Sequence, residues 1–294
     1  MKILVTGGTG FIGNNVAKEL KKLGHEVYIL IREKSELMEE YKTIVYNENL
    51  NALIEEFKKI KFDLIIHCAA LFISEHKSED IDNLIKSNIL LTTHILEAMK
   101  ISGVKKIINT STSWQHYNDE EYNPVCLYAA TKQAAEDIIK FYCEAEEFSC
   151  ITLTIFDSYG PNDKRKKLIN LLFNISKNDN QLALSPGEQY VDYIYIDDIV
   201  DAYIQSVNLL IENKLKGFNK YYLNSDTPLK LKEIVNICEE VFGKKLHVNF
   251  GARPYRVREV MTTYRKGRRL PNWYPKYSFK GGLEKIRDEK YNKE

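Results

Sequence analysis

The chain has no long hydrophobic run, no paired cysteine spacing and almost no net charge. No apolar segment approaches the roughly 20 residues that cross a bilayer, and the N-terminus lacks the pattern of a secretory signal. Its five cysteines are odd in number and show no Cys-x-x-Cys spacing, which argues against a disulfide framework or a zinc site. With 42 basic and 41 acidic side chains, nothing electrostatic indicates a nucleic acid or an anionic membrane. We expect a cytoplasmic protein with a small-molecule partner.

What is present is an ordinary globular composition with a regular pattern in its first half. The 294 residues are 44% hydrophobic and 28% charged. Short apolar runs alternate with segments of helical period, which predicts βαβ units in a Rossmann-type doubly wound parallel sheet, an α/β fold. We expect strands at 2–6, 26–30, 43–46, 63–67, 105–110 and 151–155, and helices at 12–23, 50–59, 80–101 and 127–146.

The first strand runs directly into a glycine-rich turn and then into a helix. Gly7, Gly10 and Gly13 let the backbone turn, approach a pyrophosphate and pack a helix close to the sheet. The helix begins near Phe11 and Ile12, where its unpaired N–H groups and its dipole favour an anion. A glycine triplet alone also fits a tight turn. The strand before it and the helix after it favour a dinucleotide site.

The composition changes after residue 150, because six of the seven prolines follow it and the strand and helix signals become shorter. We predict a dinucleotide-binding domain over residues 1–157 and a smaller, mainly substrate-binding C-terminal lobe over 158–294. Within the second part, 191–228 is expected to return to the first domain through helix 197–212 and strand 221–223. The two parts should pack closely, since no flexible linker separates them.

Tyr128 and Lys132 are four residues apart on a predicted helix, so that their side chains share one face. A free tyrosine has a pKa of about 10 and is a poor proton donor near neutral pH. A neighbouring ammonium stabilises the phenolate, and we expect Lys132 to lower the pKa of Tyr128. Such pairs also occur on plain helix surfaces, so the position after the fifth strand gives this one its weight.

The fifth strand ends in four hydroxyl residues, Thr110, Ser111, Thr112 and Ser113. Open α/β sheets place their ligand crevice at such carboxyl ends. A hydroxyl there can bond a substrate carbonyl and share the developing oxyanion with Tyr128. Hydroxyls that only cap a turn are the alternative. At least one of the four is expected in the crevice.

With these features together, the chain resembles the extended short-chain dehydrogenase/reductase family of nucleotide-sugar epimerases, dehydratases and ketoreductases. The resemblance covers nearly the whole length. The matching segments are 6–13, 63–70, Asn88, 111–113 with Tyr117, Tyr128 with Lys132, 156–161, 192–198, 253–254 and 270–273. It implies a catalytic Ser or Thr four residues before Tyr117, which selects Ser113, with Thr112 second.

The resemblance also implies the cofactor contacts. Ala69 and Ala70 would line the cofactor path, and Asn88 would hold the cofactor or orient Lys132. In members that use NAD, an Asp closes the second strand and bonds the ribose, whereas this chain has Ile31 and then Arg32. An Asp repels a 2′-phosphate and a guanidinium accepts it, so NADPH is expected over NADH or NAD. No metal is needed, because Tyr, Ser and Lys supply the chemistry.

Residues near the hydroxyl motif limit which reactions and substrates of this family are expected. In the family's 4,6-dehydratases an Asp-Glu pair follows the catalytic hydroxyl, but here Trp114 and Gln115 follow it and cannot serve as acid and base. The chain most resembles nucleotide-deoxysugar 4-ketoreductases of the CDP-abequose synthase type. Asp157 and Arg253 would contact the sugar nucleotide, the latter as the matching phosphate-binding Arg. The basic run 164–167 is expected to be a solvated helix start.

We therefore expect NADPH-dependent reduction of the 4-keto group of a nucleotide-linked 4-keto-6-deoxy sugar. Tyr128 would donate the proton, Ser113 would polarise the carbonyl, and Lys132 would hold the ribose. Two alternatives remain: a nucleotide-sugar 4-epimerase with tightly bound NAD, and a non-catalytic NAD(P)-sensing protein of the same fold. The resemblance also implies a homodimer, formed through helices 80–101 and 127–146.

Overall fold

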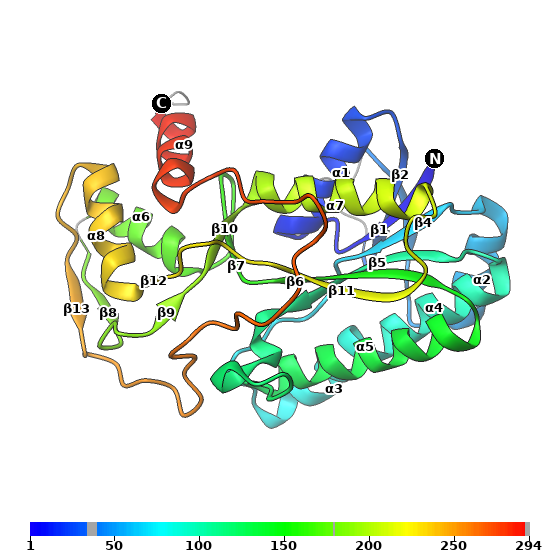
Figure 1. The fold of residues 1–294 in the computed structure, drawn as a ribbon, viewed down its shortest axis with the longest axis horizontal. Coiled ribbons are helices and arrows are strands. Elements are labelled where there is room, and N and C mark those ends of the chain that lie inside the picture. The colour runs from blue at the N-terminus through cyan, green and yellow to red at the C-terminus, as the bar shows by residue number, and fades with distance from the viewer. Residues whose placement is uncertain (34–39, 179, 292–294) are drawn as a thin grey trace.

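The computed structural model describes residues 1–33, 40–178 and 180–291, and its centre is a sheet of seven parallel strands (Figure 1). Read across the sheet, the strands are β11 (Gly217–Leu223), β6 (Ser149–Ile155), β5 (Lys106–Thr112), β4 (Leu64–His67), β1 (Lys2–Thr6), β2 (Glu26–Ile31) and β3 (Lys42–Val45). Two neighbouring strands separated by long stretches of sequence, such as β1 and β4, require crossover connections. The predicted doubly wound parallel sheet is therefore confirmed.

Helices cover both faces of this sheet, as Figure 1 shows. On one face lie α1 (Phe11–Lys22) and α7 (Ile196–Ile211), and on the other lie α2 (Leu50–Ile60), α4 (Leu91–Ser102) and α5 (Leu127–Ala145). Strand β1 reads as a continuous apolar run because it is buried from both sides. Ile3 and Val5 pack in the core under α1 and α7, whereas Leu4 packs under α2 and α4.

The segment predicted as one helix over 80–101 is divided in the structure. It starts with a short 3₁₀ turn (Ser78–Asp80) and α3 (Ile81–Ile85), passes through a π-helical turn (Lys86–Leu90) and continues as α4. Residue Asn88, in the π turn, is buried and bonded to backbone groups outside the helix. A π turn of this kind is often found at a functional site.

The C-terminal half contributes a smaller lobe with short elements. These are β7 (Asp157–Tyr159) paired with β10 (Tyr193–Tyr195), β9 (Tyr190–Val191) paired with β12 (Leu229–Lys230), β8 (Leu182–Leu184) paired with β13 (Val248–Phe250), and the helices α6 (Leu168–Asn178), α8 (Leu231–Phe242) and α9 (Phe279–Tyr291). The same half sends α7 and β11 back to the large sheet, where Gly217 pairs in register with Ser149. The boundary at residue 157 stays a prediction.

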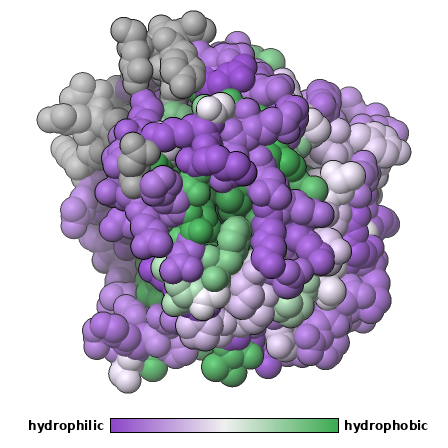
Figure 2. Space-filling model, turned by 90° about the vertical axis from the view of Figure 1, so that its left-hand side faces the viewer, coloured by the Kyte–Doolittle hydropathy of each residue, from purple (hydrophilic) through white to green (hydrophobic). Residues whose placement is uncertain are grey.

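Figure 2 views the molecule from the side of α6, α8 and β13. The surface there is mainly hydrophilic, and hydrophobic residues gather near its centre. Among the described residues, none of the helices combines the length and the apolar character that a bilayer crossing requires.

Candidate active site

The turn between β1 and α1 leaves no space for a side chain at Gly7 or Gly13. Gly7 has a φ of 69°, which residues with a Cβ rarely adopt, and a Cβ there would lie 2.7 Å from the Ala69 amide nitrogen. A Cβ at Gly13 would clash with the Gly7 carbonyl oxygen. The Gly10 N–H donates to that carbonyl at 2.9 Å. Bare backbone at a helix start is what a dinucleotide pyrophosphate requires, so these residues fit the predicted cofactor.

A cleft of about 760 Å³ opens beside this turn and is termed the Arg32 cleft. Arg32 directly follows β2 and is exposed. Lys86 and Glu48 also line the cleft and form an ion pair at 3.1 Å, and neither was among the predicted site residues. The predicted cofactor residues that line it are Gly7, Gly10, Arg32, Ala69 and Ala70.

A second cleft, of about 240 Å³, is termed the Tyr128 cleft. It shares Gly7, Gly10 and Ala70 with the Arg32 cleft, so the two clefts meet at the glycine turn. The predicted residues that line it are Gly7, Gly10, Phe11, Ile12, Gly13, Ala70, Thr112, Ser113, Tyr128, Lys132 and Asp157. All four residues predicted to be catalytic are therefore in one place.

The sheet and one helix bring these four side chains together. Tyr128 and Lys132 lie one turn apart near the start of α5. Thr112 and Ser113 stand where β5 ends and a short 3₁₀ turn (Ser113–Gln115) begins. The strand ends two residues later than predicted, because Thr112 still pairs in register with Ile155 of β6. Thr112 is thus held by the sheet, and Ser113 directly follows it as the first residue of the 3₁₀ turn.

The phenol of Tyr128 lies in apolar surroundings. The Phe72 ring packs edge-on against it with 5.0 Å between ring centroids. Burial raises the pKa of Tyr128 above its ordinary value, and only the neighbouring Thr112 hydroxyl acts in the opposite direction. The prediction that Lys132 lowers this pKa is wrong for the protein by itself. Removal of the phenol from water is the largest cause of the shift, and it keeps Tyr128 protonated near neutral pH.

Lys132 is fully buried, which is unusual for lysine. Burial lowers the pKa of Lys132 to about 8, while Glu136 and Cys68 favour its charged form. The ammonium therefore holds its proton near neutral pH without a direct ion-pair partner at hydrogen-bond distance among the described residues. A buried cation beside the glycine turn is suited to the hydroxyls of a bound ribose.

Asn88 holds the start of α5 instead of reaching a cleft. Its side chain accepts from the Leu71 N–H at 2.7 Å and donates to the Leu71 carbonyl at 3.1 Å. Its other N–H donates to the Thr131 hydroxyl at 2.9 Å, and Thr131 donates to the Tyr128 carbonyl at 2.7 Å. Of the two predicted roles for Asn88, this geometry favours the indirect one.

The same network continues to β1 through His67. His67 is buried between the Thr6 hydroxyl, 2.8 Å from Nδ1, and the Thr92 hydroxyl, 2.9 Å from Nε2. Since Thr92 donates its own proton to the Asn88 carbonyl, Nε2 carries the hydrogen of a neutral ring. Burial lowers the pKa of His67 to about 3. The Ala69 N–H bonds to Thr6, so the network reaches the cofactor turn.

A third cleft, of about 390 Å³, leads from the Tyr128 cleft towards the C-terminal lobe and is termed the Arg253 cleft. Arg253 is exposed, and its N–H donates to the Leu184 carbonyl at 3.1 Å. The Arg256 guanidinium lies 5.5 Å from the centre of the Trp114 ring. The residues shared with the Tyr128 cleft are Phe72, Ser113, Trp114, Phe156, Asp157 and Lys167.

Two basic residues that the sequence prediction left in solvent line the Tyr128 cleft. Within the run 164–167, Arg165 stacks over the Phe11 ring at 4.5 Å, and Lys167 forms an ion pair with Asp157 at 3.2 Å. A run of basic residues before a helix has the same sequence pattern whether it faces solvent or lines a cleft. No signal in the spacing distinguishes the two cases.

Residues 3–214 match the model of the NAD dependent epimerase/dehydratase family, a span that includes the glycine turn, the end of β5 and the Tyr128–Lys132 pair. The chain belongs to this family. It is an enzyme of the epimerase/dehydratase class, as the resemblance predicted, and the family is NAD-dependent by description.

Several known proteins are similar to this chain over nearly its whole length. CDP-abequose synthase from Salmonella muenchen is 28% identical over 293 residues, which cover 97% of this chain and 96% of the relative. Among solved structures, the UDP-glucose 4-epimerase of Thermotoga maritima matches over the full length of both chains with a TM-score of 0.87 at 22% identity. MoeE5 in complex with UDP-glucose and NAD also matches over both full lengths, with a TM-score of 0.85 at 21% identity. Both structures show the fold.

Proposed function

We propose that the protein reduces the 4-keto group of a nucleotide-linked 4-keto-6-deoxy sugar with NADPH. The observation that carries this proposal is the convergence of Thr112, Ser113, Tyr128 and Lys132 in the cleft that the glycine turn borders. The nearly full-length relative named CDP-abequose synthase supports a deoxysugar substrate.

The chemistry needs a hydride, a proton and a way to hold the carbonyl. A bound nicotinamide supplies hydride chemistry beside the Tyr128 cleft. Tyr128 holds the proton for the carbonyl oxygen, and its raised pKa keeps it in the donor form. Because the phenol is a weak acid in this state, the proton transfers only when negative charge develops on that oxygen.

The hydroxyls at the end of β5 hold the carbonyl. Ser113 lines both the Tyr128 cleft and the Arg253 cleft, which suits contact with substrate. Thr112 faces the phenol and also accepts a hydrogen bond from the Trp114 N–H at 3.3 Å. We assign Ser113 to polarise the carbonyl and Thr112 to orient Tyr128. Lys132 would donate hydrogen bonds to the ribose hydroxyls of the cofactor. Its positive charge would favour negative charge on the carbonyl oxygen of the substrate.

Arg32 supports NADPH as the cofactor. It lines the cleft next to the glycine turn, where an adenosine ribose would lie, and it follows Ile31 instead of an acidic residue. A guanidinium binds phosphate with paired hydrogen bonds. Lys86 adds a second cation to the same cleft.

Trp114 and Gln115 support reduction over dehydration. Trp114 borders the cleft, with its ring packed 5.3 Å from Phe72, and the two rings offer an apolar wall to a C6 methyl group. Gln115 is buried and donates to Glu136 and Gln133, so it is turned away from any ligand. Neither side chain supplies the acid and base that removal of water would require.

The charged residues of the Arg253 cleft suit the diphosphate of a sugar nucleotide. Arg253, Arg256 and Arg258 line it together with Lys166 and Lys167. Asp157, paired with Lys167, stands at the junction with the Tyr128 cleft and is proposed to contact the sugar. Bidentate guanidinium contacts give the orientation that a single ammonium does not.

The test is loss of the near-ultraviolet absorbance of NADPH or NADH with a panel of CDP-, dTDP-, GDP- and UDP-linked 4-keto-6-deoxy sugars. We expect turnover with NADPH and a product that carries a 4-hydroxyl group. Turnover with NADH alone would contradict the role given to Arg32. No turnover with any member of the panel would contradict the reductase.

The second candidate is a nucleotide-sugar 4-epimerase with tightly held NAD, which a relative named UDP-glucuronate 4-epimerase, 28% identical over 96% of this chain, supports. An epimerase keeps its dinucleotide through the cycle. Protein that retains NAD through gel filtration and interconverts UDP-hexoses without added cofactor would establish this candidate instead.

We further infer a cytoplasmic homodimer. Helices α4 and α5 each expose a large apolar side chain, Ile101 and Phe141, which supports contact with a second copy. Light scattering on the wild type should give the mass of a dimer. A monomer would contradict this assignment.

A further inference from the structure

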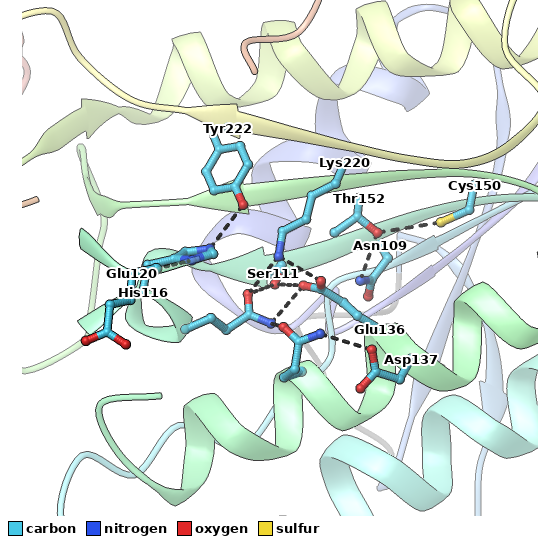
Figure 3. A network of polar contacts seen from close by, with 12 residues as sticks. Asn109, Ser111, His116, Glu120, Glu136, Asp137, Cys150, Thr152, Lys220 and Tyr222 are labelled. Carbon is cyan, nitrogen blue, oxygen red and sulfur yellow. Dashed lines mark hydrogen bonds and ion pairs between the residues drawn. The ribbon is translucent and has the colours of Figure 1, made fainter. Parts of the chain in front are cut away.

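A carboxylate that the proposed chemistry does not use lies beneath the hydroxyl end of β5. Glu136 stands on α5, one turn beyond Lys132, and its side chain is only 3% exposed. Figure 3 shows it at the centre of a polar network drawn from three elements: α5, the end of β5 and β11. Charged groups are rarely buried unless they have partners.

The partners of Glu136 lie on both sides of the catalytic hydroxyls in the sequence. Its Oε1 accepts a hydrogen bond from the hydroxyl of Ser111, the residue before Thr112. The same oxygen accepts from Gln115 Nε2 at 3.0 Å, two residues after Ser113. One carboxylate oxygen therefore fixes the backbone before and after the two hydroxyl residues.

The other carboxylate oxygen is neutralised from the edge of the sheet. Lys220 on β11 places its Nζ 2.8 Å from Glu136 Oε2, and the Lys220 side chain is 19% exposed. Gln115 also donates to Gln133 Oε1 at 2.9 Å, which ties the 3₁₀ turn to α5 a second time. The network thus joins the edge strand β11, the end of β5 and the helix α5, which carries the proposed proton donor.

We propose that Glu136 is a positioning residue that fixes the hydroxyl end of β5 against α5, with Lys220 as its counter-ion. The role rests on the proposed reduction, since it concerns how Ser113 and Thr112 are held relative to Tyr128. A displacement of about 1 Å of a positioning group costs up to about 100-fold in rate. Removal of the carboxylate should therefore lower kcat without removing any group that touches the substrate.

The test separates positioning from folding by a paired substitution. Glu136→Met alone leaves the Lys220 ammonium buried without its partner and should lower the unfolding temperature. The double variant Glu136→Met with Lys220→Met replaces the ion pair by apolar side chains of similar length, which restores the unfolding temperature. We expect kcat of the double variant to stay between about tenfold and 100-fold below wild type, with KM for NADPH unchanged.

Amide hydrogen exchange gives a readout without substrate or cofactor. In the double variant, exchange over residues 111–116 should become faster than in wild type, because the contacts of Glu136 with Ser111 and Gln115 are lost. Tyr142→Phe is the control. Tyr142 also lies on α5, 14 residues after Tyr128, and its hydroxyl donates a hydrogen bond of 2.7 Å to Glu97 on α4. Loss of this hydrogen bond should leave kcat and the exchange over 111–116 unchanged.

The two sets of results distinguish this inference from the proposed function. A double variant with wild-type kcat and wild-type exchange over 111–116 would overturn the positioning role. Wild-type protein that reduces no substrate would overturn the proposed function, while the exchange of residues 111–116 would still decide whether Glu136 holds the strand end.

Discussion

The two sides of Tyr128 are built from different kinds of contact. Beneath the glycine turn, the polar network is neutral and buried, as with His67 and Asn88, and exposed charges such as Arg32 stand only at the outer end of the Arg32 cleft. Towards the C-terminal lobe, the polar side chains are charged and partly exposed. The Asp157 and Lys167 side chains of one such ion pair are 27% and 29% exposed, and Arg256 pairs with the exposed Glu75 at 3.5 Å.

This difference matches what each side is proposed to bind. Buried neutral hydrogen bonds fix geometry, because a broken one leaves an unsatisfied polar group that costs about 1–3 kcal/mol. Half-exposed ion pairs contribute at most about 1 kcal/mol, so their members can exchange partners for a phosphate at little cost. The buried network beneath the proposed cofactor site is therefore rigid, and the proposed substrate side is able to adapt.

The largest effect on activity should come from Tyr128, which lies between the proposed cofactor side and the proposed substrate side. Tyr128→Phe removes the proton donor and nothing else, so kcat should fall by about 10²- to 10⁴-fold. Steady-state kinetics with the best substrate of the panel measures this. NADPH binding, followed by its fluorescence, should match wild type. A variant that keeps wild-type kcat would remove Tyr128 from the mechanism.

On the cofactor side, His67 should make the fold sensitive to acid. Its folded pKa of about 3 lies below the ordinary 6.5, so the unfolded chain binds the extra proton first. Stability is then lost as pH falls from about 6.5 to about 3, by on the order of 4 kcal/mol over the window. Denaturant titrations of wild type and His67→Gln at several pH values measure the difference.

The free energy of unfolding is compared between the two proteins as a function of pH. The difference between their slopes separates the effect of His67 from that of the carboxyl groups that titrate in the same pH range. The wild type should lose more stability than His67→Gln between pH 6 and pH 4, although the variant starts lower because Thr6 and Thr92 lose partners. Parallel curves for the two proteins would mean that the buried ring is not kept neutral by the fold.

Arg32 should decide which dinucleotide binds. Arg32→Ala removes the charge-assisted bonds to a 2′-phosphate and should weaken NADPH binding by about tenfold to 100-fold, while NADH binding stays within about twofold. Fluorescence titration with each cofactor measures both constants. An equal loss for NADPH and NADH would show that Arg32 contributes no selectivity, and the cofactor assignment would then fail.

The smallest effect on the fold should come from the substrate side. Lys167→Ala breaks the ion pair with Asp157 and should change the free energy of unfolding by less than about 1 kcal/mol, since both partners are partly exposed. KM for the sugar nucleotide should rise several-fold. Strong destabilisation would mean that this cleft is as rigid as the cofactor side.

The parts of the site that the sequence revealed are those set by short-range spacing. Gly7, Gly10 and Gly13 lie on one turn, and Tyr128 and Lys132 lie one helical turn apart, so local geometry alone places them together. The hydroxyl run at the end of β5 followed from the rule that parallel strands expose their carboxyl ends at one edge. The family and the fold expected from these motifs were both confirmed.

The parts that the sequence did not reveal depend on residues distant in the chain. Arg165 and Lys167 read as a solvated run until the lobe folds against the glycine turn. Glu136 reads as a helical surface charge until Lys220, 84 residues away, reaches it from the sheet edge. The pKa of Tyr128 was predicted in the wrong direction, because spacing reports a neighbouring charge but not the loss of water.

The sequence alone therefore determined the order of strands and helices, the glycine turn and the pairing of Tyr128 with Lys132 on one helix face, since each follows from periodicity or from the stereochemistry of a few adjacent residues. Only the tertiary structure decided which charges face a cleft, which are buried and which side chains hold the catalytic ones. Burial and long-range pairing are properties of the packed chain, and they set the local dielectric that determines how each group ionises.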